Sequence, residues 1–193
     1  MNDGALVITR ALAVYQRLTE AGIDCAIGGA LALAFHTDDP RATRDIDVNV
    51  ALPRAQARRA LAALPDDVPW NDTHLAAIER DGQVRIQWPV DGAVPIPLDL
   101  FFAESPYHDL VAQRTIEVPL RDRTVRIVSS TDLTVFKALF DRSKDWPDIE
   151  AMLDARNSSV DLDEAIGWVA EFVGDEDPRT TKLRALQRDR NRR

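Results

Sequence analysis

Two aspartates stand one residue apart in the apolar segment RDIDVNVAL. Alternate residues of a β-strand point to the same side, so Asp45, Asp47 and Asn49 share one face, and the apolar residues between them share the other. Two carboxylates this close repel each other unless a cation neutralises them, and hard carboxylate oxygens suit Mg²⁺. The spacing therefore predicts a magnesium site on the polar face of this strand.

A third carboxylate, Asp99, stands in a second apolar segment, PIPLDLFF. The residues on either side of Asp99 form the buried face of that strand, so Asp99 points the other way. If the two strands are neighbours, Asp99 completes a three-carboxylate cluster with Asp45 and Asp47. Such a cluster can hold two metal ions about 3.5–4 Å apart for an in-line phosphoryl or nucleotidyl displacement. The alternative interpretation is a half-exposed strand whose polar face is hydrated and holds no metal.

A glycine pair, Gly28-Gly29, follows the apolar segment DCAI and precedes a short helical stretch. Glycine lets the backbone approach a ligand closely, and the start of a helix offers N–H groups to an anion. A triphosphate at this turn could meet a metal ion held by Asp45 and Asp47. A tight turn that needs small residues is the alternative. Just before the acid pair, Arg44 can neutralise phosphate or the aspartates, and solvent exposure is the alternative for this arginine.

Four charged residues further along the chain are spaced four, three and four apart: Lys137, Asp141, Lys144 and Asp148. On one continuous helix they share a face. Lys137 can meet a triphosphate as a point charge. One alternative is a solvated stripe of salt bridges, and another is a helix break with Asp145 as N-cap and Asp148 three residues later, close to a capping box.

Strands and helices alternate in the first two thirds of the chain, and helices dominate afterwards. The pattern predicts helices at 5–18, 30–35 and 53–64, strands at 24–28, 44–52, 84–89 and 94–102, a hairpin within 115–129, and helices from Thr131 onward. Asp-Gly pairs at Asp81 and Asp91 indicate two turns. The predicted fold class is α+β: a mixed sheet flanked by helices in residues 1–129, followed by a helical region in 130–193 whose basic end, from Pro178, is expected to fray.

Composition limits the function classes. The chain has 193 residues, 45% of them hydrophobic, with a net charge of -8, which argues against a general nucleic-acid-coating protein. The single cysteine, Cys25, excludes an internal disulfide and is expected in the core. His36, His74 and His108 have no partner at zinc spacing and are interpreted as structural or surface residues. The start of the chain does not resemble a signal peptide and no apolar run is long enough for a membrane span, so the cytoplasm is the expected location.

These motifs together resemble a known superfamily. Ile27-Gly28-Gly29, Asp45-x-Asp47 and the later strand Asp99 resemble the signature of the nucleotidyltransferase superfamily that includes DNA polymerase β. The segment GGALAL…RATRDIDV is similar to the AbiEii-type nucleotidyltransferases, which act as toxins of toxin–antitoxin pairs. The resemblance spans residues 24–153, and its C-terminal part is similar to a helical segment that supplies a lysine followed by a Lys/Arg-Asp-x-x-Asp element.

The resemblance implies a role for each matching position. Asp45, Asp47 and Asp99 would hold Mg²⁺, and these three with Lys137 would be catalytic. The residues that would contact the nucleoside triphosphate are Gly28, Gly29, Thr43, Arg44, Lys137, Asp145 and Asp148.

The resemblance also implies a reaction and partners. The enzyme would transfer a nucleotide from an NTP to an acceptor hydroxyl with release of pyrophosphate. For a toxin the implied acceptor is the 3′ end of tRNA, and the implied protein partner is a cognate antitoxin. The alternatives are an enzyme that modifies a protein or a small molecule, and a non-catalytic protein of the same fold that binds a partner.

Overall fold

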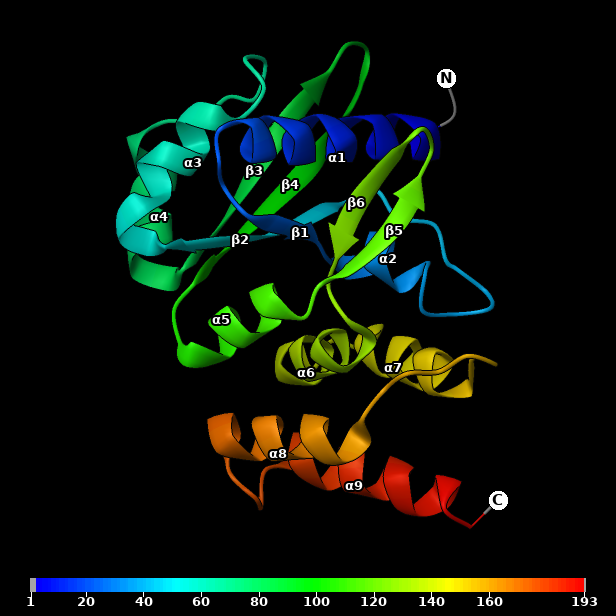
Figure 1. Ribbon diagram of the computed structural model, residues 1–193. Coiled ribbons are helices and arrows are strands. Elements are labelled where there is room, and N and C mark those ends of the chain that lie inside the picture. The colour runs from blue at the N-terminus through cyan, green and yellow to red at the C-terminus, as the bar shows by residue number, and fades with distance from the viewer. Residues whose placement is uncertain (1–2, 193) are drawn as a thin grey trace. The chain divides into compact units, whose positions relative to one another are not determined.

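The computed structural model describes residues 3–192. Its helical elements are α1 (Asp3–Glu20), α2 (Gly29–Leu33), the short 3-10 helix η1 (Arg54–Gln56), α3 (Ala57–Ala63), α4 (Asp72–Asp81), α5 (Pro106–Gln113), α6 (Ser130–Phe140), α7 (Asp145–Asp154), α8 (Leu162–Val173) and α9 (Pro178–Arg190). Its strands are β1 (Cys25–Ile27), β2 (Ile46–Pro53), β3 (Gln83–Val90), β4 (Ala93–Ala103), β5 (Ile116–Leu120) and β6 (Arg123–Ile127) (Figure 1). The predicted α+β class, with a mixed sheet flanked by helices, is confirmed.

All of these strands belong to one sheet, in the order β3-β4-β2-β1-β6-β5. The pairs β2–β4 and β1–β6 are parallel, whereas β1–β2, β3–β4 and β5–β6 are antiparallel. Strands β2 and β4 are neighbours although α3, α4 and β3 separate them in sequence, so polar residues of both strands can meet on one face.

The apolar face of the sheet is covered by helix α1. Residues of β2, β3 and β4 alternate between buried and more exposed positions, as expected for strands with one buried face. Helix α1 packs against β1 and β2 through its buried residues, among them Ala11 and Val14. Its Arg10 lies over the ring of Trp88 with 4.4 Å from the guanidinium carbon to the ring centroid, and donates a hydrogen bond to the Trp88 carbonyl at 3.1 Å.

Two of the helices, α4 and α5, were not predicted from the sequence. The Asn71 side chain accepts hydrogen bonds from the first turn of α4, and His74 Nδ1 accepts from the Asn71 backbone, which completes a capping box. Gly82 ends α4 with φ +66°, so the predicted turn at Asp81-Gly82 is a helix C-cap instead. A glycine at positive φ serves both purposes, which is why the dipeptide alone does not distinguish them.

The C-terminal helices form a bundle of their own. Helix α6 contacts α7, α8 and α9, and α8 contacts α9. The core of this bundle consists of fully or nearly fully buried apolar residues: Leu133, Val135, Ile149, Met152, Val169 and Leu183. The prediction that the basic end frays from Pro178 is wrong, because Pro178–Arg190 form α9, which buries Leu183 and Thr180.

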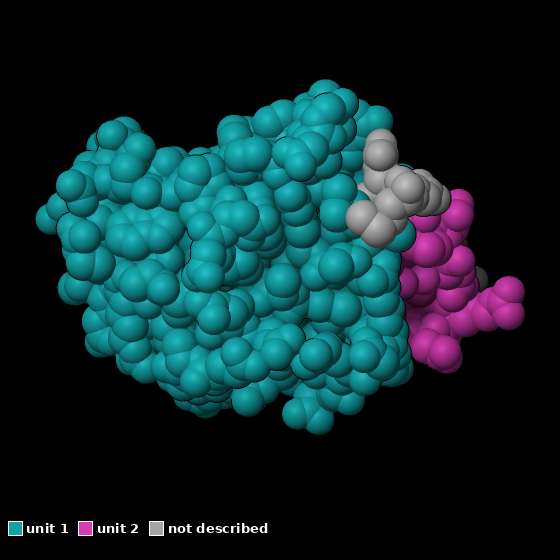
Figure 2. Space-filling view, turned by 90° about the horizontal axis from the view of Figure 1, so that it is seen from above, with its two compact units in different colours: residues 1–32, 41–128 teal, residues 33–40, 129–193 magenta. Residues whose placement is uncertain are grey.

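Contacts divide the described chain into two compact units. Unit 1 comprises the sheet with its helices, residues up to Ala32 together with 41–128, and unit 2 comprises 33–40 and the residues from Ser129 onward (Figure 2). The three predicted acids lie in unit 1, and Lys137, Asp145 and Asp148 lie in unit 2. Within residues 3–192, no helix combines the length and apolar character that a membrane crossing requires.

Candidate active site

Asp47 and Asp99 are cross-strand partners at the centre of the sheet. The two strands β2 and β4 run parallel with Asp47 opposite Asp99 and Asn49 opposite Phe101. Both aspartates lie on the polar face, because their neighbours Ile46, Val48, Leu98 and Leu100 are fully buried on the other. The strand pattern that buries the apolar residues therefore brings these two carboxylates together.

Asp45 stands one residue before β2 begins and is positioned by a local turn. Its backbone N–H donates to Thr43 Oγ1 at 3.2 Å, so the Thr43 hydroxyl shapes the entry to the strand. The Asp45 side chain keeps 30% of its surface exposed. Arg44, between them, is exposed. Thr43 thus supports the acid pair, and Asp45, Thr43 and Arg44 all lie at the same end of β2.

The glycine pair packs directly against Asp47. Gly28 N–H donates to the Asp47 carbonyl at 2.8 Å, and Gly29 begins α2 with φ +53°. A Cβ atom at Gly29 would overlap the Asp47 carboxylate, and one at Gly28 would lie 2.8 Å from Asn49 Nδ2. At position 29, only glycine leaves room for this carboxylate and adopts the left-handed backbone conformation without strain. The turn and the acid are therefore parts of one local structure.

A residue that sequence reasoning missed, Arg85 of β3, contacts this acidic group. Its Nε and Nη2 donate to the two oxygens of Asp99 at 2.8 and 2.7 Å, a bidentate pair. Its Nη2 also lies 3.8 Å from an oxygen of Asp45. The hydrogen bonds to Asp99 raise the pKa of Arg85, and the charges of Asp99, Asp45 and Asp47 add to this effect. Arg85 thus brings a positive charge to Asp99 and Asp45 on the acidic face.

One signal for Arg85 was present in the sequence. The segment QVRIQW alternates polar and apolar residues, which places Arg85 on the same face as Asp99. Its exact partner depends on a register shift between Trp88 and Val90, which sets Arg85 opposite Asp99. Alternation could have identified the face of β3 on which Arg85 lies, but not its pairing with Asp99.

With Arg85 in place, the acids are not arranged as a preformed metal site. Among residues 3–192, no three histidine, cysteine, aspartate or glutamate side chains are grouped closely enough to hold an ion. The donors are nevertheless of the right kind, because Asp45, Asp47 and Asp99 offer carboxylate oxygens, which Mg²⁺ prefers. A metal ion at Asp99 would have to share or replace the contact with Arg85.

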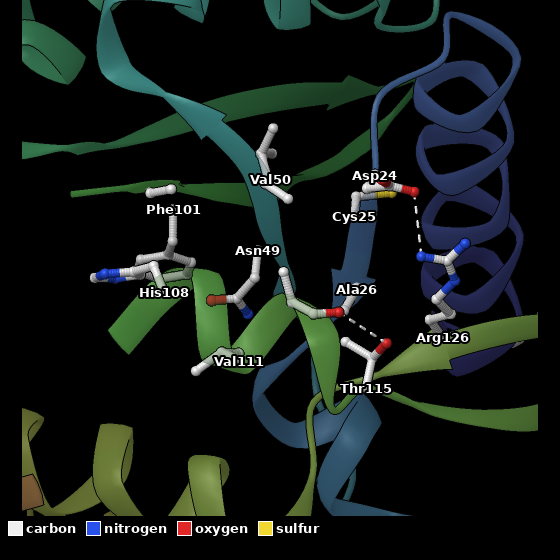
Figure 3. Close-up of a pocket in the computed structure, with 13 residues that line it drawn as sticks. Asp24, Cys25, Ala26, Asn49, Val50, Phe101, His108, Val111, Thr115 and Arg126 are labelled. Atoms are coloured by element: carbon white, nitrogen blue, oxygen red, sulfur yellow. Dashed lines mark hydrogen bonds and ion pairs between the residues drawn. The ribbon is translucent and has the colours of Figure 1, made fainter. Parts of the chain in front are cut away.

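A small pocket lies on the same sheet face, further along the strands. Asn49 and Phe101 face His108 and Val111 of α5 across it (Figure 3). Its volume of about 30 Å³ is enough for about one water molecule and far too small for a nucleotide. Burial lowers the pKa of His108, which contacts the Ser105 hydroxyl at 3.0 Å. We therefore assign this pocket to the packing of α5 rather than to substrate.

The structure clarifies the cysteine and the other histidines. Cys25 is buried in β1, and burial raises the pKa of its thiol to about 12, as suits a core residue. His74 completes the capping box of α4 and thus has a structural role. His36 lies in unit 2, just after α2, and is partly buried.

In unit 2, the predicted lysine and both aspartates form a buried ionic cluster. Lys137 Nζ lies 2.6 Å from Asp148 and 3.6 Å from Asp145, and all three side chains are at least 94% buried. Arg142 donates to Asp145 through Nε at 2.7 Å and through its backbone N–H at 3.1 Å. The two aspartates of α7 therefore orient Lys137 of α6.

Of the two structural alternatives for this segment, the salt-bridge stripe is wrong, and the helix break is present but without Asp145 as its N-cap. Helix α6 ends at Phe140, and Asp141 has φ +52°, so the four charges do not form a stripe on one helix. Asp145 is not an N-cap: Lys144 precedes α7, and the Asp145 carboxylate is turned toward Arg142. The Asp141 carboxylate accepts instead from Trp146 Nε1 at 2.6 Å. The expected break is therefore present, between residues 140 and 145, whereas the cap assigned to Asp145 is not.

We expect Lys137→Met to lower the free energy of unfolding by about 3 kcal/mol, because it leaves Asp148 buried without its closest cation. Lys144→Met is the matched control. Lys144 is exposed, and its replacement should change stability by less than about 0.5 kcal/mol. Urea unfolding followed by far-UV circular dichroism measures both. Equal stability of the two variants would show that the buried cluster does not depend on Lys137.

Comparison with solved structures supports the same fold. A nucleotidyltransferase-like antigenic protein from Paracoccidioides brasiliensis is 19% identical, with a TM-score of 0.53 and 93% of each chain covered. JHP933 from Helicobacter pylori is 14% identical, with a TM-score of 0.51, covering 94% of this chain and 78% of that one. The lincosamide antibiotic adenylyltransferase LnuA, solved with lincomycin bound, is 13% identical, with a TM-score of 0.50, covering 76% and 96%. At these identities the likeness concerns the fold.

Sequence families give the closer assignment. A comparison with curated protein sequences found no match. The family described as nucleotidyl transferase AbiEii toxin, type IV toxin–antitoxin system, matches residues 13–193. This match covers both the sheet with its acids and the helical bundle with Lys137. The chain therefore belongs to the AbiEii nucleotidyltransferase family, and it is a nucleotidyltransferase.

Proposed function

We propose that this chain transfers a nucleotide from a nucleoside triphosphate to an acceptor hydroxyl, with Mg²⁺ held by Asp45, Asp47 and Asp99. The observation that carries the proposal is the pairing of Asp47 with Asp99 on neighbouring parallel strands, beside a glycine turn packed against Asp47. Carboxylate oxygens and a glycine turn meet there in a chain of the AbiEii family.

The residues fit a divalent ion by the chemistry of their side chains. The three acids supply carboxylate oxygens, and the Asp47 carboxylate occupies the space that a Cβ at Gly29 would fill. When bound, the ion would supply Lewis-acid stabilisation of charge on the phosphoryl oxygens. The Gly28-Gly29 turn would lie against the phosphates, where a side chain would obstruct them.

In the proposed reaction, the acceptor oxygen forms a bond to the α-phosphorus, and the bond from that phosphorus to the bridging oxygen of pyrophosphate breaks. The proton of the acceptor hydroxyl goes to Asp99, which acts as general base once Arg85 no longer occupies its oxygens. Thr43 and Arg44 would contact the nucleotide at the start of β2. Lys137, oriented by Asp145 and Asp148, would contribute a positive charge to the triphosphate.

For the acceptor, we propose the 3′ end of tRNA, with a cognate antitoxin as protein partner. The toxin description of the matched family supports the antitoxin partner. The basic helix α9 gives little support to RNA as the acceptor, because arginines of this helix form ion pairs with acids. The pairs are Arg179 with Asp177, Arg184 with Asp175, and Arg190 with Asp154. Recognition of RNA would therefore depend on shape and end contacts rather than on a broad positive patch.

The test is a transfer assay with each α-labelled NTP, Mg²⁺ and total tRNA. We expect label on tRNA with one nucleotide preferred, and loss of transfer when EDTA removes the ion. Label on protein, or on a small hydroxylated acceptor supplied instead, would keep the enzyme assignment and replace the acceptor. No transfer to any of these, together with no Mg²⁺-dependent nucleotide binding, would contradict the proposal and favour a non-catalytic binding protein.

A further inference from the structure

Arg85 and Asp99 form the most complete polar contact of the acidic face. Two guanidinium nitrogens donate to two carboxylate oxygens at 2.8 and 2.7 Å. The Asp99 side chain is only 11% exposed, whereas that of Arg85 is 52% exposed. Asp99 is thus fixed in the sheet. Arg85 reaches it from the edge strand β3 through a long side chain that is partly exposed to solvent.

The contact uses the same oxygens that a metal ion would need. Asp99 accepts a hydrogen bond from Arg85 at each carboxylate oxygen, and Nη2 of Arg85 also lies 3.8 Å from an oxygen of Asp45. A guanidinium in this position brings one positive charge close to two of the acids. A divalent ion on Asp99 would be repelled by that charge, and the lone pairs that face Arg85 are already used, so that only the outer lone pair of each oxygen is left for it.

We propose that Arg85 keeps the acidic face closed to divalent ions: Arg85 and the metal ion are alternative partners of Asp99, and the site becomes active only when the metal ion displaces Arg85. The proposal rests on the function proposed above. With Arg85 bound, both Asp99 oxygens already accept a hydrogen bond, which leaves only their outer lone pairs for the proton of an acceptor hydroxyl. The arginine can leave without disturbing the fold, because half of its side chain is already in solvent.

The proposal predicts how strongly free protein binds a metal in the absence of nucleotide. In Arg85→Gln, the competing cation is gone, so Mn²⁺ used as a probe for Mg²⁺ should bind about fivefold more tightly, at the upper end of the range expected for a well-aligned exposed pair. Arg85→Lys, which keeps the charge but not the bidentate geometry, should lie between Arg85→Gln and the wild type. Electron paramagnetic resonance of free Mn²⁺ measures all three affinities.

A matched control separates this effect from a general loss of positive charge. Arg54 belongs to the same unit, has a similar exposure of 44%, and pairs with Glu104 at 3.2 Å. Arg54→Gln removes the same charge away from the three acids and should leave Mn²⁺ affinity within about twofold of wild type. An Arg85→Gln variant that binds Mn²⁺ no more tightly than Arg54→Gln overturns the proposal.

Nuclear magnetic resonance of the wild-type protein gives a test without any substitution. The Nε–H of Arg85 is hydrogen-bonded to Asp99, and its resonance, assigned by its absence in Arg85→Lys, should move toward the free arginine position as Mg²⁺ is added. A resonance that stays unchanged at saturating Mg²⁺ overturns the exchange of partners.

The two proposals fail in different ways. If Mn²⁺ binds the wild type and is lost in Asp47→Asn, but Arg85→Gln does not increase affinity, only the role of Arg85 is overturned. If Mn²⁺ binding is the same in wild type, Asp47→Asn and Arg85→Gln, the metal site itself is overturned, and the role of Arg85 with it.

Discussion

Asp47→Asn is expected to lower the rate of nucleotide transfer by about 10³-fold while the protein remains folded. The substitution keeps the size of the side chain beside Gly29 but removes the negative charge, and several kcal/mol of metal-dependent stabilisation of the transition state depend on that charge. The measurement is kcat/KM for the labelled NTP with the acceptor identified in the transfer assay.

Asp24→Asn serves as the matched control for Asp47→Asn. Asp24 lies in the same unit, is 72% exposed and pairs with Arg126 at 3.1 Å, away from the acidic pair. Its replacement should leave transfer within about twofold of wild type, since an exposed pair contributes little. Comparable activity of Asp47→Asn and Asp24→Asn would refute the assignment of Asp47.

Gly29→Ala should abolish transfer nearly as completely, by about 10³-fold, through the position of Asp47 rather than its charge. The added Cβ would overlap the Asp47 carboxylate, and the φ of +53° is strained for any residue with a Cβ. The carboxylate must therefore move, and a misplaced catalytic group loses most of its effect. Stability should fall as well, by about 2 kcal/mol.

Gly92→Ala separates backbone strain from the clash with Asp47. Gly92 has φ +67° in the turn between β3 and β4, but nothing lies within 4 Å of its Cβ position. This variant should lose about 1 kcal/mol of stability and retain transfer activity. If Gly29→Ala loses no more activity than Gly92→Ala, the glycine turn does not position Asp47, and the coupling between the two motifs is disproved.

The sequence predicted the faces of the strands better than their partners. Period-two alternation in RDIDVNVAL and PIPLDLFF is unambiguous, and both segments form strands with their acids on the polar face. The metal hypothesis assumed that β2 and β4 are neighbours and could not derive this from the sequence. Alternation shows which face of a strand is buried but not which strand lies beside it. For β2 and β4 the order along the chain does not help either, because α3, α4 and β3 lie between them in sequence.

The partner of Arg85 shows how a small irregularity limits such predictions. A hairpin extended regularly from the turn at Asp91-Gly92 would place Arg85 opposite Leu98, on the wrong face for an ion pair. The shift between Trp88 and Val90 moves the register by one residue and sets Arg85 opposite Asp99. A bulge of this kind has no distinct signal in the segment WPVDGAVP, so the ion pair could not be derived from the sequence.

The helical region was predicted in outline but not in detail. The break after α6 follows from Asp141 adopting a left-handed conformation, and Asp145 is buried because Arg142 and Lys137 surround its carboxylate. Helix α9 has few hydrophobic residues, and of its leucines only Leu183 is completely buried. The composition of this segment therefore led to the prediction that it frays. Packing within unit 2, rather than local propensity, decides both features.

The position of a bound metal ion tests the central claim most directly. Crystals grown with Mn²⁺ and a non-hydrolysable NTP analogue would locate the ion by its anomalous scattering. We predict a peak within coordination distance of carboxylate oxygens of both Asp47 and Asp99, with the Arg85 guanidinium moved away from Asp99. An analogue bound with no manganese at these aspartates, or manganese held by other side chains, would contradict the account.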